Sequence, residues 1–317
     1  MTTPTVVRTA DAVELAGAPP VPARTRRGAG GGWRLLYPVA AFALVIAVWE
    51  LVKALVPANG VSVGGQRVLP RTTDAALPHS WAVLTVLGER DGKTTVGATL
   101  LRTAGFTLEL ALLALGLGTL VGIALAVLMQ RFSFVERGLL PYVIVSQTVP
   151  LIALAPLVAG WGGKINIAGQ PWQPWMSIVV IASYLVFFPV AIGTLRGLQS
   201  PAKASVELLH SCAAGWWATL LHLRLPAAVP HILPALRLGA AASVIGSVVA
   251  EISTGTAGGI GRQIIVFSQQ STGNAARLYA AVIAAALLGV VLTGLVAALE
   301  GLLRRYARPG HTSGARR

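Results

Sequence analysis

The sequence predicts an all-α, polytopic membrane protein with six transmembrane helices. Hydrophobic residues make up 55% of the 317 positions, and charged residues only 11%. A soluble domain carries about 25% charged residues, because its surface must be solvated. The mean hydropathy is +0.71, and the apolar residues come in long blocks. These observations indicate that lipid is the solvent of most of the chain.

The charge of the chain is strongly positive, at +14, which raises the question of nucleic-acid binding. The basic residues, however, gather in the two tails and beside apolar blocks, which is the positive-inside pattern of membrane proteins. No nucleic-acid partner is therefore expected. The single cysteine, Cys212, excludes an internal disulfide and a cysteine-based metal cage. No metal or other cofactor is expected.

The first hundred residues predict a tail, a span and a water-exposed segment. Residues 1–32 are rich in Pro, Gly, Thr and Arg, which is typical of a flexible tail. The first span is expected over residues 33–56 and is retained as an anchor, because no cleavage-like site follows a short apolar region. Residues 57–100 are polar with mixed charge and belong in water. The second span is expected over residues 104–130, where Arg131 stops it.

The third and fourth spans flank a short loop. The third covers residues 139–161 and contains Pro141, Pro150 and Pro156. Three prolines predict a bent or locally opened helix, which is tolerated only where protein or a water-filled path satisfies the freed carbonyls. The fourth span is expected over residues 174–195.

The fifth and sixth spans are expected over residues 230–252 and 276–302. The transmembrane domain then covers residues 33–308, with a cytoplasmic tail at 309–317. Six spans place both ends of the chain on one side of the membrane, and the excess of basic residues in the tails and in residues 131–138 and 196–237 predicts that this side is the cytoplasm. The chain is thus expected to be a multi-pass protein of the cell membrane.

Residues 201–226 form a loop that is longer than a simple connection requires. Apolar and small residues recur in and just beyond it at helical spacing: Val206, Leu209, Ala213, Trp217 and Leu220. Three prolines at 226, 230 and 234 are then expected to break the structure before the fifth span. The pattern predicts a short amphipathic helix, a turn and a second helix that project toward a partner.

This loop resembles the EAA loop of ABC importer permeases, whose pattern is Glu-Ala-Ala, three residues, Gly, about nine residues and Ile-x-Leu-Pro. Glu207 matches the glutamate, and residues 223–226, Leu-Arg-Leu-Pro, match the end of the pattern at the expected distance. Leucines at 208 and 209 replace the two alanines. Ala213 stands where glycine is usual, and Gly215 follows two residues later.

Two further stretches resemble the nitrate, sulfonate and taurine branch of these permeases. Residues 146–162, SQTVPLIALAPLVAGWG, are similar to its third-span stretch. Ala250-Glu251, followed by Gly-Gly-Ile-Gly at residues 258–261, is similar to the pattern after its fifth span. The resemblance covers about residues 33–308, and it implies a fold like that of type I ABC importer permeases, with a cytoplasmic coupling-helix loop.

The resemblance implies a subunit that forms the translocation path for a small polar solute, which an external solute-binding protein delivers. A pair of separate ABC ATPase subunits would supply the energy. The one near-match to a phosphate-binding loop, at residues 88–94, has a residue too few between its glycines. A second permease copy, as a homodimer or a heterodimer, completes the implied assembly. The stretch from Gln147 to Pro156 favours a thiamine-pyrimidine precursor or riboflavin over sulfonates, taurine or nitrate.

The resemblance also assigns roles to individual residues. It places ATPase coupling at Glu207, Leu209, Ala213, Gly215, Leu225 and Pro226. Glu207 is expected to supply a charged contact or a helix N-terminal charge, Ala213 a close backbone approach, and Leu225-Pro226 the end of the element. Candidates for the translocation path are Gln147, Pro150, Pro156 and Glu251. Buried polar groups in membranes are costly, but hydrogen bonding between helices is an equal alternative for Gln147 and Glu251.

One alternative function remains open. A secondary transporter or channel would act without ATP, yet such carriers often show repeated halves and paired intramembrane charges, and no repeat is evident here.

Two glycine pairs, Gly118-x-x-x-Gly122 and Gly193-x-x-x-Gly197, permit close helix packing. Packing within the chain is expected of them, with dimerisation as the alternative.

Overall fold

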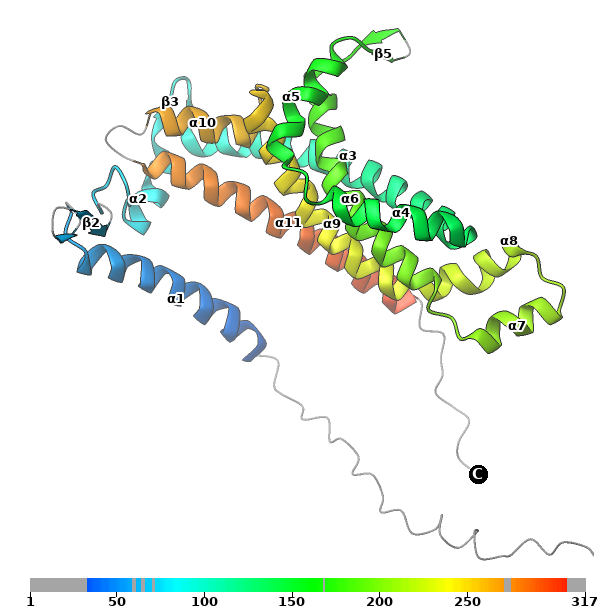
Figure 1. Ribbon diagram of the computed structural model, residues 1–317. Helices are drawn as coiled ribbons and strands as arrows, with labels where there is room; N and C mark the ends of the chain where they lie inside the picture. The colour runs from blue at the N-terminus through cyan, green and yellow to red at the C-terminus, as the bar shows by residue number, and fades with distance from the viewer. Residues whose placement is uncertain are drawn as a thin grey trace, which may run out of the picture. The chain divides into compact units, whose positions relative to one another are not determined.

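The computed structural model describes residues 33–306, except 59–60, 64–65, 70–71, 168 and 271–274. The predicted tails at 1–32 and 309–317 lie outside the described residues. The chain divides into two units, residues 1–49 and residues 50–317, and the described part of the first unit is helical throughout. Figure 1 labels the helices and strands. Their bounds are α1 Trp33–Leu55, β1 Val61–Val63, β2 Gln66–Leu69, α2 Ser80–Thr85, a 3₁₀ turn Val86–Gly88, β3 Arg90–Asp91, β4 Thr94–Thr95, α3 Val96–Arg131, α4 Ser133–Ser146, α5 Leu151–Gly162, β5 Asn166–Ile167, β6 Gln170–Pro171, α6 Pro174–Leu198, α7 Lys203–Ser211, α8 Trp216–Thr219, a π-helical turn Leu220–Arg224, α9 Leu225–Thr254, α10 Ile260–Gln270 and α11 Ala276–Tyr306.

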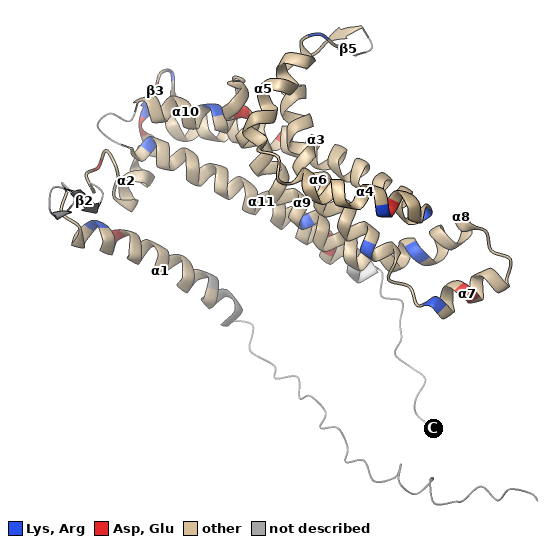
Figure 2. Cartoon of the chain, in the orientation of Figure 1, with Lys and Arg blue, Asp and Glu red and all other residues tan. Residues whose placement is uncertain are grey.

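The predicted all-α membrane fold is confirmed. Among the described residues, four helices are long and apolar enough to cross a membrane: α3, α6, α11 and the helix that α8, the π turn and α9 form together over Trp216–Thr254. The bent pair α4 and α5 makes a fifth span if it is counted as one. Helix α1, with 23 residues, coincides with the first predicted span. Figure 2 shows few charged side chains along the long helices.

Helices α3, α6 and α9 pack closely through small residues. A Cβ at Gly122 of α3 would lie 2.8 Å from the Phe187 carbonyl oxygen of α6. A Cβ at Gly197 of α6 would lie 2.8 Å from the Cα of Ala228 in α9. Only glycine permits these backbone approaches. Both predicted glycine pairs therefore pack helices within the chain.

The same contacts set the directions of the helices. In α3 and α6, Gly118 lies against Val186, and Met129 shares a cluster with Leu195, so the two helices run parallel. Helix α9 runs antiparallel to α6, and α11 antiparallel to α9. The C-terminal ends of α3, α6 and α11 therefore share one end of the bundle with the start of the 216–254 helix.

Three of the predicted span boundaries differ from the structure. Helix α3 begins at Val96 rather than near 104, because the Thr95 side chain accepts a hydrogen bond from the Ala98 amide (3.2 Å) and caps the helix. Helix α6 extends to Leu198. The fifth span begins near Trp216 rather than 230, because the prolines expected to interrupt it lie inside a continuous helix.

The third predicted span is strongly bent, as expected. Helices α4 and α5 meet at 103° across residues 147–150. Pro141 lies inside α4 and Pro156 inside α5, so only Pro150 coincides with the break. Before the break, the amides of Gln147, Thr148 and Val149 bond to the carbonyls three residues earlier, so α4 ends in a tight 3₁₀-like turn.

The polar segment after α1 is folded rather than extended. It contains the antiparallel hairpins β1–β2 and β3–β4 and the short helix α2. Lys53 pairs with Asp74, and this partner holds the pKa of the Asp74 carboxyl below its usual range. Arg277 of α11 bonds to Glu89 (3.0 Å), which ties the segment to the start of the last helix.

Candidate functional site

The predicted coupling loop folds as a helix, a tight turn and a second helix. Helix α7 ends at Ser211, and Ala213 follows with φ 55°, the left-handed region that favours glycine. The Ala213 amide donates to the His210 carbonyl (2.9 Å), and the Ala214 amide to the Leu209 carbonyl (3.0 Å). This pair of bonds is a Schellman motif. Ala213, at the position where the EAA pattern has glycine, is therefore the residue at which the chain turns.

The side chains of α7 are turned to the outside. None of its nine residues is buried, and Leu208 is 66% exposed. Leu209 is half-buried. Glu207 is exposed, lies in the middle of α7 and makes no ion pair with any described residue, so the expected helix N-terminal charge is wrong. The remaining expectation, a charged contact with a partner, stays a prediction.

The second helix of the loop continues directly into the membrane span. Gly215 is the N-cap residue of α8, and its carbonyl accepts from the Thr219 hydroxyl (3.1 Å). The expected end at Leu225-Pro226 is wrong. The Leu225 amide bonds to the Leu220 carbonyl across the π turn, so Pro226 directly follows this turn inside a helix that continues to Thr254.

The start of this helix is clamped to the end of α6. The Arg224 guanidinium donates from Nη1 to the carbonyl of Leu198, the last residue of α6 (3.1 Å). This carbonyl has no partner within its own helix, so the side chain completes the C-terminus of α6. Leu220 and Ala228 are buried beside it. Arg224 thus joins this helix to the C-terminal end of α6.

The α4–α5 break brings polar groups together inside a predicted span. Pro150 has no N–H to give to the Ser146 carbonyl, which instead accepts from the Val149 amide (3.3 Å) and from the Tyr184 hydroxyl of α6. Gln147 is half-buried, and its Nε2 is buried without a partner among the described residues. Pro150 and Pro156 are exposed. A buried polar donor without a partner among the described residues thus lies beside the break.

Glu251 is fully buried and bonded on both carboxylate oxygens. Oε1 accepts from the Thr107 hydroxyl and Oε2 from the Gly261 amide, each at 2.8 Å. The Thr107 oxygen also accepts from the Ile260 amide (2.9 Å). The carboxylate therefore sits at the N-terminus of α10, where its charge is favourable. This arrangement corresponds to the alternative of hydrogen bonding between helices.

Three residues in these contacts were not among the predicted site residues: Thr107, Tyr184 and Arg224. Each binds a group that is far away in the sequence, with 144 residues between Thr107 and Glu251. A threonine or a tyrosine in an apolar span carries no local signal of such a contact. Arg224 lies within the matched loop pattern, but at a position that the pattern leaves open.

Comparison with known proteins identifies the family. The family described as "Binding-protein-dependent transport system inner membrane component" matches residues 118–305. A putative aliphatic sulfonates transport permease protein of Bacillus subtilis is 30% identical over 278 residues, which cover 87% of this chain and 88% of the relative.

A formylaminopyrimidine transport permease protein of Halalkalibacterium halodurans is 34% identical over 145 residues. The match covers 46% of this chain, which spans about half (54%) of that relative. A riboflavin transport system permease protein of Chloroflexus aurantiacus is 28% identical over 55% of this chain and 60% of its own.

A solved structure shares the fold. The crystal structure of an amino acid ABC transporter with histidines matches with a TM-score of 0.51 and 22% identity, over 66% of this chain and 94% of the other. The membrane fold and the helix–turn–helix loop are consistent with the family match over residues 118–305. The chain belongs to the family of binding-protein-dependent transport system inner membrane components.

Proposed function

We propose that the chain is the membrane-spanning permease subunit of an ATP-driven importer, and that α7 engages a separate ATPase subunit. The observation that carries the proposal is a contrast between two neighbouring elements. Helix α7 has no buried residue, whereas the helix that follows it, Trp216–Thr254, continues without a break into the membrane span. An amphipathic helix that leaves Leu208 and Glu207 exposed is suited to a groove on a partner. ATP hydrolysis then belongs to that partner.

The connection behind α7 supports a mechanical role. The helix over Trp216–Thr254 has 39 residues, which corresponds to a length of about 58 Å. It begins four residues after Cys212 and crosses the whole bundle. Movement of α7 by an ATPase would reach α9 through this helix and α6 through the Arg224 clamp. Such rigid-body motion is the usual means of alternating access.

The solute path is proposed to follow the α4–α5 break. Gln147 Nε2 would donate to a polar solute, and Pro150 would keep the helix open beside it. Pro156 would bend α5 along the path, and Glu251 would shape it by holding α10 in place. We propose two permease copies around the path, with an external binding protein that delivers the solute.

The relatives guide the choice of solutes. The names of two of them refer to formylaminopyrimidine and riboflavin, and others to aliphatic sulfonates, taurine and nitrate. We propose a pyrimidine precursor of thiamine, or riboflavin, as the first solute to test. Sulfonates, taurine and nitrate come next.

The test uses the chain co-expressed with its ATPase in proteoliposomes, with Glu207→Lys as the main variant. We expect the variant to insert normally, to lose ATPase in co-purification and to lose ATP-dependent uptake. Lys93→Glu is the matched control, because it reverses an exposed charge in the β3–β4 hairpin. Uptake by the purified chain without any ATPase would replace this proposal with a secondary carrier.

The proposed topology places both termini in the cytoplasm. The shared end of α3, α6 and α11 then lies on the cytoplasmic side, together with α7. A reporter fused after Arg317 should be active inside the cell only. Activity outside the cell would contradict the topology and the placement of α7.

A further inference from the structure

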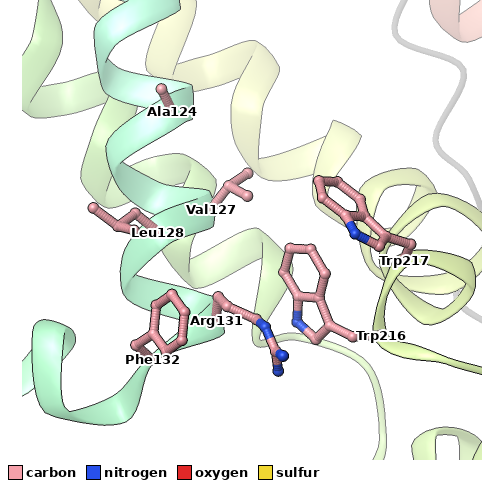
Figure 3. Close-up of a pocket in the computed structure, with 7 residues that line it drawn as sticks. All are labelled: Ala124, Val127, Leu128, Arg131, Phe132, Trp216 and Trp217. Carbon is pink, nitrogen blue, oxygen red and sulfur yellow. The ribbon is translucent and has the colours of Figure 1, made fainter.

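A groove opens between the C-terminal end of α3 and the start of the 216–254 helix (Figure 3). Its volume is about 470 Å³. One wall is formed by α3 and the residue after it, and the other by the two tryptophans of α8. The residues that line the groove are Ala124, Val127, Leu128, Arg131, Phe132, Trp216 and Trp217.

Two hydrogen-bond donors face this groove without a partner among the described residues. The Arg131 guanidinium lies 5.0 Å from the ring centre of Trp216 and 5.4 Å from that of Phe132, and it makes no hydrogen bond or ion pair with any residue that the structure describes. Its N–H groups are therefore held in place by the rings and remain available. The Nε1–H of Trp216 is buried and also lacks a partner. Figure 3 shows this nitrogen on the side of the ring that faces Arg131.

The rest of the groove is apolar and follows the membrane span. Ala124, Val127, Leu128 and Arg131 lie at helical spacing, so they form one stripe along α3. Arg131 is the last residue of the span, and the stripe leads from it into the apolar part of the helix. Leu128 is 44% exposed and Trp217 67% exposed. Tryptophan and arginine at the end of a span are typical of the headgroup level of a bilayer.

We propose that this groove binds an anionic phospholipid of the leaflet that surrounds the α3 C-terminus. The phosphate accepts hydrogen bonds from Arg131 and, after a rotation of the Trp216 ring that exposes its buried nitrogen, from Trp216 Nε1, and one acyl chain lies along the Ala124–Leu128 stripe. A soluble anion would leave the apolar stripe uncovered. A zwitterionic phospholipid also has a phosphate, but it would bring its own headgroup cation close to the Arg131 charge.

The lipid would link two moving parts. It joins the end of α3 to Trp216, the first residue of the helix that leads from α7 into the membrane. On the proposed function, bound anionic lipid would therefore set how firmly the coupling helix is held against the bundle. Lipid binding itself does not depend on that function.

The test measures lipid binding to the full chain, purified with its ATPase in phosphatidylcholine nanodiscs that contain phosphatidylglycerol. Native mass spectrometry counts retained lipids, and tryptophan quenching by brominated phosphatidylglycerol or brominated phosphatidylcholine reports contact. Arg131→Gln should lower the apparent affinity for phosphatidylglycerol about tenfold, because a charge-assisted contact is lost. Trp216→Phe, which keeps an aromatic ring near Arg131 but removes the N–H together with the five-membered part of the indole, should lower it about threefold.

Arg196→Gln is the matched control, since Arg196 is an exposed arginine in the last turn of α6 at the same end of the bundle. It should leave phosphatidylglycerol binding unchanged. Equal losses in Arg131→Gln and Arg196→Gln would overturn the proposal, as would equal quenching by the two brominated lipids. Loss of the ATPase from Arg131→Gln with unchanged lipid binding would also overturn it and would assign the groove to a protein partner. Neither lipid measurement requires ATP, a binding protein or transport, so the proposed function and the lipid site fail independently.

Discussion

The chain carries three prolines in each of two segments, and only one segment is broken. Residues 141–156 form two helices that meet at 103°. Residues 226–234 lie within a helix that runs without a break from 216 to 254. A proline inside a helix removes one hydrogen bond and clashes with the preceding turn, so the number of prolines alone predicts a break in both.

The spacing of the prolines explains part of the difference. Pro226, Pro230 and Pro234 are four residues apart, so they occupy nearly one face of the helix, and all three are exposed. The opposite face carries Ala228 and Ala235, which pack on the glycines of α6. The missing hydrogen bonds therefore fall on the side that does not hold the helix in place.

In the broken segment the prolines are nine and six residues apart, so they lie on different faces. At Pro150 a side chain from another helix replaces the missing donor, because Tyr184 bonds to the Ser146 carbonyl. The comparison teaches that a proline breaks a span where an external donor stabilises the open form. Where packing holds the other face, the helix continues.

The most direct way to break this comparison is to exchange Pro150 for alanine. Pro150→Ala restores an N–H for Ser146 and favours a continuous helix by about 3 kcal/mol. We expect ATP-dependent uptake to fall about tenfold, because a continuous helix would remove the bend on which the proposed solute path depends. Pro230→Ala is the control and should retain uptake, because that helix is already continuous. Equal uptake by the two variants would refute a special role for Pro150.

A bulky residue at the α6–α9 contact should unseat the continuous helix. Gly197→Leu places a side chain where Ala228 lies, and we expect it to lower the free energy of unfolding by about 2–3 kcal/mol. The measurement is the thermal unfolding midpoint in detergent. Gly116→Leu has open space at its Cβ and should leave the midpoint almost unchanged. If Gly116→Leu were as damaging, the contact with α9 would not be what holds the helix.

Removal of the external donor at the break sharpens the comparison further. Tyr184→Phe leaves the Ser146 carbonyl without its side-chain partner and should cost on the order of 2 kcal/mol in the free energy of unfolding. Tyr142→Phe is the matched control, because Tyr142 is 73% exposed and its hydroxyl has no bond to a described residue. A chemical-denaturation series of both variants measures the difference. Identical midpoints would show that the hydroxyl does not stabilise the break.

The smallest expected effect concerns the turn at Ala213, where the chain changes direction without a proline. Ala213 has a positive φ, which costs an L-residue with a Cβ about 1–2 kcal/mol. Ala213→Gly should raise the free energy of unfolding by about 0.5–1 kcal/mol, after the entropy of glycine is subtracted. Ala214→Gly, at ordinary φ, should lower it by about 0.5 kcal/mol. Thermal unfolding of the two variants should therefore shift in opposite directions, and shifts of the same sign would contradict the strained turn.

Much of the fold could be predicted from the sequence because the signals are local. The long apolar blocks and the helix–turn–helix pattern of the loop depend only on neighbouring residues, and both are confirmed. The family resemblance also rested on a local pattern, from Glu207 to Pro226. Position 213 was identified by that pattern, and the structure supplies its reason in the left-handed backbone.

What the tertiary structure decided depends on contacts between distant segments. The two segments contain six prolines, and although their spacing explains part of the difference, packing against α6 is needed to keep the 216–254 helix continuous. The partners of Glu251, Ser146 and Leu198 are Thr107, Tyr184 and Arg224, each from another part of the chain. A buried polar group accepts whichever donor the fold brings near, because leaving it unpaired is costly. The spacing of apolar residues along the chain thus determined where the helices form. Helix packing and the need to pair buried polar groups determined which distant segments come together.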